Sequence, residues 1–276
     1  MPAPAIAMSP YQYLKPVARS ALSQTWVARD TRRDDKTLYI IQKLDFHTDN
    51  VSLMAFGQTL LGHKVQTLQP LLKELASAHT IHDSFSDGQS FYIVQSLVRG
   101  RPLHRLRLQD PATRPPLLPL LSQILMLLQQ SYRWGLGSCC LHPGDLIQCQ
   151  ADNSWVWTGT GIFKTIVQQV SKPTLALTDL FPKETAAYFS PEFLQGRFDV
   201  RSDLYTVGVA MIQALTQLPL ADLVYGNDGY FTIRRNWYRQ RQLPDVLVAT
   251  LNRMVNANPL KRYSTIAEVL DELEQP

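Results

Sequence analysis

The sequence is poor in cysteine, and its three cysteines form no C-x-x-C spacing. An odd number of cysteines without that spacing argues against a disulfide framework and against a structural zinc site. Free cysteines suit a reducing compartment, so we expect a cytoplasmic protein. Long apolar runs are also missing: no stretch approaches the length of about 18 apolar residues that predicts a membrane span. The start, residues 1–10, lacks the basic segment of a signal peptide, and we interpret it as a flexible tail.

Acidic residues are absent from three long windows of the chain. No Asp or Glu occurs in residues 51–73, 111–144 or 153–178. Carboxylates are the usual protein ligands of Mg²⁺ and are frequent general bases. Chemistry that needs a carboxylate inside one of these windows is therefore excluded, whichever position in the window is considered.

What is present suits a large globular fold. The 276 residues are 45% hydrophobic and 18% charged, enough for one large domain or two packed lobes with a real core. The net charge of +4 is mildly basic and requires no particular class of partner.

Strand signals dominate the first 95 residues, and helix signals dominate the rest. The expected strands are residues 25–28, 37–41, 81–85 and 91–95. One helix is expected to begin after Asn50 and to be ended or interrupted by Pro70. The helices expected later in the chain are residues 116–134, 207–217, 245–255 and 265–274. The change of character near residues 96–101 indicates a β-rich lobe followed by an α-rich lobe.

Five segments in this order resemble motifs of protein kinase domains. They are YIIQKL at residues 39–44, GQSFYIVQSL at 88–97, SPEF at 190–193, RSDLYTVGV at 201–209 and NPLKRYSTIAEVLDEL at 258–273. The resemblance covers residues 11–273 and is closest to the Ser/Thr kinases of cyanobacteria. It implies an α+β, bilobal protein kinase-like fold, with a β-rich N-lobe containing one helix (11–96) and a larger helical C-lobe (97–276).

The resemblance also implies roles for four residues. Lys43 takes the position of the nucleotide-binding lysine of strand three. In the C-lobe, Asp203 would anchor the catalytic-loop backbone, and Arg262 would pair with Glu192.

The phosphate-binding parts depart from the kinase pattern. Ala18, Ser20 and Ser23 occupy the glycine positions of the first loop, where a Cβ keeps backbone amides away from phosphate. No acid on the following helix can hold Lys43, and Gln58 is the best match for the missing glutamate. Lys43 is thus interpreted as a vestigial site residue. Ile41 stands where a small residue faces the adenine and is expected to crowd it.

The catalytic loop departs further. Aligning H-R-D-L-x-P-x-N with residues 138–145 puts Ser138 and Cys139 in place of the His and Arg. Cys140 then replaces the catalytic Asp, and His142 replaces a lysine. Asp145 takes the Asn position. A second register instead takes His142 and Asp145 as the His and Asp, and it restores a base. We interpret Cys139 and Cys140 as a small buried pair rather than a nucleophile or redox site.

The metal motif D-F-G is replaced by Gly159-Thr160-Gly161. Glycine supplies no oxygen ligand from a side chain, and Asp145 alone would bind metal poorly. We therefore expect no metal site. Ser138 and Thr160 also remove two bulky groups that stack between the lobes of an active kinase.

These losses predict a pseudokinase: a regulatory or scaffolding module, not an enzyme, without a cofactor or Mg-ATP, whose partner is another protein. An alternative is an atypical enzyme that uses Lys43, His142 and Asp145 on a nucleotide. A further alternative is a basic nucleic-acid module, in which Trp237 and Tyr238 lie among the arginines of residues 234–241.

Overall fold

The computed structural model describes residues 10–19, 23–46, 50–74, 79–112, 114–133, 143–158, 186–197, 199–225, 232–233, 236–239 and 242–274. These residues form two compact units, one up to Val98 and one from Arg99 onward.

Unit 1 is built on a five-stranded antiparallel sheet. Its strands are β1 (Tyr11–Arg19), β2 (Ser23–Asp30), β3 (Leu38–Asp45), β4 (Ile81–Ser86) and β5 (Ser90–Ser96). They lie in the order β1-β2-β3-β5-β4, and β4 and β5 are joined by a tight turn in which Gly88 has a φ of +88°. This sheet confirms the strands expected from sequence. These segments form strands because their β-branched and aromatic residues alternate between the two sheet faces.

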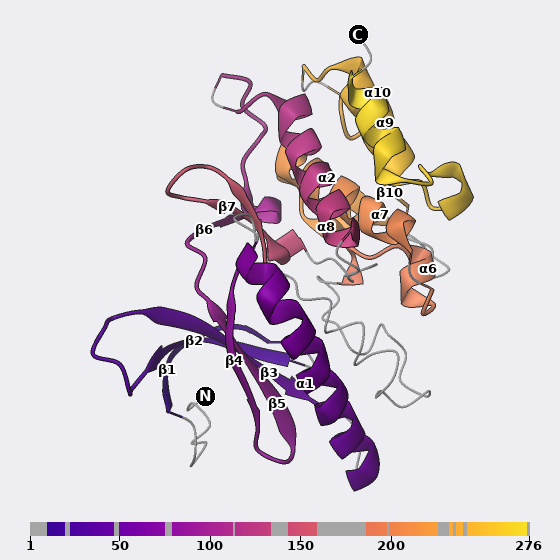
Figure 1. The fold of residues 1–276 in the computed structure, drawn as a ribbon. Helices are drawn as coiled ribbons and strands as arrows, with labels where there is room; N and C mark the ends of the chain where they lie inside the picture. The colour runs from indigo at the N-terminus through magenta and orange to yellow at the C-terminus, as the bar shows by residue number, and fades with distance from the viewer. Residues whose placement is uncertain are drawn as a thin grey trace. The chain divides into compact units, whose positions relative to one another are not determined.

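Helix α1 (Val51–Glu74) covers one face of this sheet (Figure 1). Asn50 caps it, because its Oδ1 accepts from the N–H of Leu53 at 3.1 Å. The expectation that Pro70 ends or interrupts the helix is wrong, since α1 continues to Glu74. Proline removes one helix hydrogen bond and costs about 3 kcal/mol. Continuing the helix buries Leu72, which is 2% exposed. Burial of a leucine contributes roughly 1.5–3 kcal/mol, which offsets the cost of the proline.

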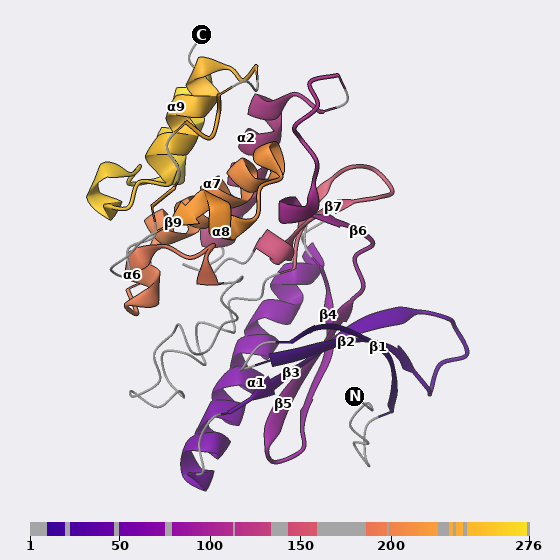
Figure 2. The same ribbon diagram turned by 180° about the vertical axis from the view of Figure 1, so that it is seen from behind.

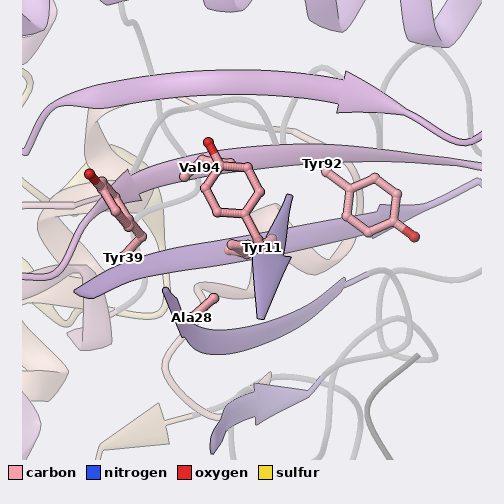
Figure 3. Close-up of a cluster of buried hydrophobic side chains, with 6 residues drawn as sticks. Tyr11, Ala28, Tyr39, Tyr92 and Val94 are labelled. Atoms are coloured by element: carbon pink, nitrogen blue, oxygen red, sulfur yellow. The ribbon is translucent and has the colours of Figure 1, made fainter. Parts of the chain in front are cut away.

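A cluster of buried, largely aromatic side chains packs on the sheet (Figure 3). It consists of Tyr11, Ala28, Tyr39, Ile41, Tyr92 and Val94, with Tyr13 and Phe85 packed against it. The rings of Phe85 and Tyr92 stack at 4.7 Å, and Tyr11 stacks on Phe85 at 6.1 Å. Strand alternation puts Lys43 on the same sheet face as Ile41, so the lysine lies beside this cluster.

Unit 2 is mainly helical. Its strands are β6 (Gly100–Pro102), β7 (Leu146–Cys149), β8 (Trp155–Trp157), β9 (Val224–Tyr225) and β10 (Thr232–Ile233). Its helices are α2 (Leu117–Arg133), α6 (Pro191–Leu194), α7 (Val200–Thr216), α8 (Leu220–Leu223), α9 (Asp245–Met254) and α10 (Ile266–Glu274), with 3-10 turns η1 (Leu103–Arg105), η2 (Pro143–Asp145) and η3 (Pro259–Lys261). None of the described helices has both the length and the apolar character that a membrane crossing requires.

Helix α7 is the centre of unit 2 and packs against α9 (Figure 2). Gly208 permits this approach, because an added Cβ would lie 2.6 Å from Cγ1 of Val255. The helix begins at Val200, earlier than its apolar run, because Asp199 caps it by accepting from the N–H of Arg201 at 2.7 Å. Its first turn is polar but buried: Ser202 is 2% exposed and Asp203 is 1% exposed.

Candidate functional site

In unit 1, Lys43 is held by a carboxylate of its own strand. Its Nζ lies 2.8 Å from Oδ1 of Asp45, and both side chains are about one quarter exposed (21% and 27%). Residues two apart on a strand share a face, which brings the two groups together. The expectation that Lys43 has no acidic partner is therefore wrong. Sequence reasoning sought the partner on a helix and missed Asp45, although the spacing on the strand was visible.

A polar network surrounds this pair at the β4–β5 turn. Ser90 donates to Oδ1 of Asp45 at 2.8 Å, and the hydroxyl of Tyr92 donates to Oδ2 of Asp87 at 2.7 Å. Burial tends to raise the pKa of Asp87, but hydrogen bonds from Tyr92 and two backbone N–H groups, together with the charge of Lys43, lower it overall. Lys43 is thus influenced by two carboxylates, Asp45 and Asp87.

The helix position aligned with the kinase glutamate remains polar but is not joined to Lys43 by an ion pair. Gln58 on α1 has its Nε2 buried, with no hydrogen-bond partner among the described residues. The amide of Gln58 carries no charge, so the group that holds Lys43 in an ion pair is Asp45.

The positions that align with the glycine loop lie partly in strands. Ala18 belongs to β1 and pairs with Thr25, and Ser23 is the first residue of β2. Ser20 lies outside the described residues. Ile41 is fully buried in the aromatic cluster, so its side chain is part of the packed core.

In unit 2, Asp145 ends η2 and immediately precedes β7. Its carbonyl oxygen accepts from the N–H of Thr158 at 2.7 Å, which fastens this turn to the residue after β8. The other catalytic-loop positions, Ser138, Cys139, Cys140 and His142, lie outside the described residues. So do Gly159, Thr160 and Gly161.

His104 on η1 helps to position the same turn. Its ring hydrogen-bonds to the backbone of Pro143, which must be the carbonyl because proline has no N–H. Burial lowers the pKa of His104, although this hydrogen bond works in the opposite direction. Sequence reasoning did not select His104, since a lone histidine in an irregular segment gives no recognisable signal.

Glu192 and Arg262 form a buried ion pair. Arg262 donates from Nη1 to Oε1 at 2.6 Å and from Nη2 to Oε2 at 3.0 Å, and it is 2% exposed. Burial tends to raise the pKa of Glu192, but the hydrogen bonds and charge of Arg262 lower it overall. Ser190 places the glutamate locally, because it caps α6 and is followed by Pro191 at the first helical position.

Asp203 is tied to a neighbouring helix. Its Oδ2 accepts from the hydroxyl of Tyr132 on α2 at 2.8 Å. The catalytic-loop backbone that it was expected to anchor lies largely outside the described residues, so that role stays a prediction.

Trp237, a candidate for stacking on nucleic-acid bases, is 4% exposed. Its Nε1 donates to Oδ1 of Asn252 at 2.9 Å. A buried indole cannot stack on a base, so this side chain contributes to the interior of unit 2.

Comparison with solved structures identifies the fold. The kinase domain of Mycobacterium tuberculosis PknI, solved as a point mutant, matches with a TM-score of 0.61 and 16% identity, over 99% of this chain and 98% of that one. The chain has a protein kinase-like fold. At this level of identity, the likeness concerns the fold alone.

Curated relatives add a functional direction. Serine/threonine-protein kinase B of Synechocystis is 25% identical over 270 residues, 96% of this chain and 46% of that protein. Serine/threonine-protein kinase D of the same organism is 23% identical over 92% of this chain and 50% of its own length. The chain thus spans about half the length of these relatives. No family model matches it.

The relatives overturn the expectation that the chain is not an enzyme. Proteins that align with nearly all of it are named serine/threonine-protein kinases, and its fold is that of kinase domains. That expectation rested on the motif residues that this sequence lacks.

Proposed function

We propose that the chain is a serine/threonine kinase-like phosphotransferase domain with an atypical nucleotide site. The observation that carries the proposal is the 2.8 Å ion pair between Lys43 and Asp45. A kinase lysine must be held by a carboxylate in order to contact nucleotide phosphates. Here Asp45 performs that task from the same strand.

The reaction is transfer of the γ-phosphoryl group of ATP to a serine or threonine hydroxyl. The hydroxyl oxygen bonds to the γ-phosphorus, the bond to the β–γ bridging oxygen breaks, and ADP leaves. The hydroxyl proton passes to the carboxylate of Asp145, the acid that the second register places as the base. His142, from the same register, completes the set of proposed residues.

Magnesium is not assigned to residues in this proposal. The described residues contain no group of three His, Cys, Asp or Glu side chains that fits a metal ion. No step of the proposed transfer is assigned to a metal.

We expect slow turnover. Ordinary kinases turn over at roughly 1–100 per second, and their catalysis rests on positioning and electrostatic stabilisation. A displaced or missing acid–base group costs about 10²–10⁴ in rate. A rate on the order of 10⁻² per second follows for this site.

The test is transfer of radiolabel from γ-labelled ATP to the chain itself and to a general acceptor protein, with and without Mg²⁺. We expect slow incorporation that falls at least tenfold in Lys43→Ala and Asp145→Asn. The exposed Lys73→Ala serves as the matched control and should keep the wild-type rate. Incorporation that is equal in wild type and Lys43→Ala would refute the proposal.

A second candidate function is binding of another protein as a regulatory module. It follows from the departures of the catalytic loop and of the metal motif from the kinase pattern, and the Glu192–Arg262 pair is compatible with it. The two candidates are compatible, because a kinase-like domain can both catalyse and dock.

A further inference from the structure

Unit 2 contains a pocket of about 240 Å³ outside the residues proposed for phosphotransfer. It lies where α6, the start of α7 and the segment leading into η3 meet. We call it the Arg197 pocket. Its lining residues are Pro191, Glu192, Gln195, Arg197, Asp199, Arg201, Ala257, Pro259 and Leu260.

The walls of the Arg197 pocket are fastened together by one buried side chain. Arg262 binds Glu192 on α6, and it donates to the carbonyl of Arg201 on α7 at 3.0 Å. It also donates to the carbonyls of Asn256 and Ala257, at 2.6 Å and 3.4 Å. All three walls are thereby fixed in relation to one another, so the pocket is pre-formed.

The carboxylates that line the pocket are already satisfied. Glu192 is bound by Arg262, and its Oε1 also accepts from Ser202 at 2.9 Å. Asp199 accepts from the N–H of Arg201 at 2.7 Å and pairs with the guanidinium of the same residue at 2.9 Å. Neither carboxylate needs a cation from a ligand.

The hydrogen-bonding capacity that remains consists of donors. The exposed guanidinium of Arg197 donates to the neutral Oε1 of Gln195 and forms no ion pair with the described carboxylates. Nε of Arg201 is buried and has no hydrogen-bond partner in the described part of the chain. A ligand that complements these groups must be an acceptor, and a negatively charged one complements Arg197 best.

The rim adds apolar surface, and the volume limits the ligand. Leu260 is 80% exposed at the edge of the pocket, beside Pro259. The volume is below the roughly 300–1,000 Å³ of small-molecule sites and would hold about eight waters. That space suits one or two amino-acid side chains.

We propose that the Arg197 pocket docks an acidic peptide segment of another protein. A Glu or Asp carboxylate would bind the exposed guanidinium of Arg197, and an adjacent aliphatic side chain would cover Leu260. Charge complementarity carries the choice of occupant, because the lining carboxylates are neutralised while Arg197 is not. This docking goes beyond phosphotransfer and does not depend on it.

The test uses the full isotope-labelled chain and two capped tripeptides at millimolar concentration. One has the sequence Glu-Leu-Leu, and the other is its neutral isostere Gln-Leu-Leu. We expect saturable amide shifts around Gln195 and Leu260 with the acidic peptide, and at least fivefold weaker binding of the neutral one. Equal binding of the two peptides, or no binding of the acidic one, would overturn the proposal.

Two variants and one control complete the experiment. Arg197→Ala and Leu260→Asp should each weaken the acidic peptide at least fivefold, and both residues are exposed, so the thermal midpoint should not change. Arg133→Ala, an exposed arginine at the end of α2, should bind as wild type. Unchanged binding by Arg197→Ala contradicts the proposal. So does tenfold tighter binding of a phosphoserine-Leu-Leu peptide, which would assign the pocket to phosphopeptides.

Discussion

Arg262 binds Glu192 with both arms of its guanidinium, at 2.6 Å and 3.0 Å, across 70 residues of sequence. The remaining donors of Arg262 are used by backbone carbonyls, and its guanidinium carbon lies 4.7 Å from the centre of the Tyr205 ring. A buried charge pair is tolerated only when its hydrogen-bonding groups are satisfied in this way. The pair is therefore a structural cross-link of unit 2.

Removal of Arg262 should destabilise the protein strongly. In Arg262→Ala, Glu192 keeps the hydrogen bond from Ser202 but becomes a buried carboxylate without a compensating positive charge. The free energy of unfolding should fall by about 3–5 kcal/mol. Arg33→Ala is the matched control, because its ion pair with Asp35 is exposed and contributes little to stability. Urea denaturation followed by tryptophan fluorescence measures both. Equal losses in the two variants would show that the Glu192–Arg262 pair is not a cross-link.

Asp45 both orients Lys43 and neutralises it, and two substitutions separate these effects. Asn at position 45 keeps an oxygen acceptor for Lys43 but removes the charge that holds the lysine in an ion pair. We therefore expect Asp45→Asn to bind ATP several-fold more weakly, and Lys43→Ala to lose binding. Titration calorimetry measures both, with Asp35→Asn as a control distant from Lys43 on the hairpin loop. Unchanged or tighter ATP binding by Asp45→Asn would contradict the role of the carboxylate in holding Lys43.

Gly100 permits β6 to approach β7, the strand that follows Asp145. A Cβ at Gly100 would lie 2.1 Å from the carbonyl oxygen of Gln148, which is backbone and cannot easily move. We expect Gly100→Ala to lower the free energy of unfolding by at least about 2 kcal/mol.

Gly62→Ala provides the opposite control for this substitution. Nothing lies within 4 Å of an added Cβ at this position in α1. Alanine should therefore stabilise the helix by about 0.5–1 kcal/mol. Chemical denaturation of the two alanine variants should show shifts of opposite sign, and shifts of the same sign would contradict the close approach at Gly100.

Acidification should destabilise unit 2 through His104. Burial lowers its pKa below the ordinary value of 6.5, so the folded state favours the neutral ring. The stability from this group is fully present above the unfolded pKa and is lost as the pH falls below about 6.5. Urea midpoints at pH 7.5, 6.5 and 5.5 should fall in that order.

His104→Gln should reduce this pH dependence without removing it. Burial also lowers the pKa of His82 in unit 1, so a dependence in the same direction remains. If the slope of stability with pH is the same in wild type and His104→Gln, the effect does not arise from His104.

The sequence by itself determined the order and type of the main elements. Alternating β-rich segments defined β2 to β5, and the turn Asp87-Gly88 between β4 and β5 follows from local chemistry. The kinase-like fold followed from motif order, and the separation of Glu192 and Arg262 in sequence was no obstacle because each sits in a recognisable motif. Local propensity and spacing are encoded in neighbouring residues, so they can be recognised without a structure.

Packing decided the remainder. Pro70 stays inside α1 because burial of Leu72 offsets the lost hydrogen bond. A rule based on neighbouring residues alone does not compare these two energies. Trp237 is buried rather than available to bases, since α9 supplies Asn252 as its partner. The Arg197 pocket exists only where three segments distant in sequence are joined by Arg262. Which side chains are buried, and which charged groups stay without an ion-pair partner, depends on which segments meet. Only the tertiary structure specifies that.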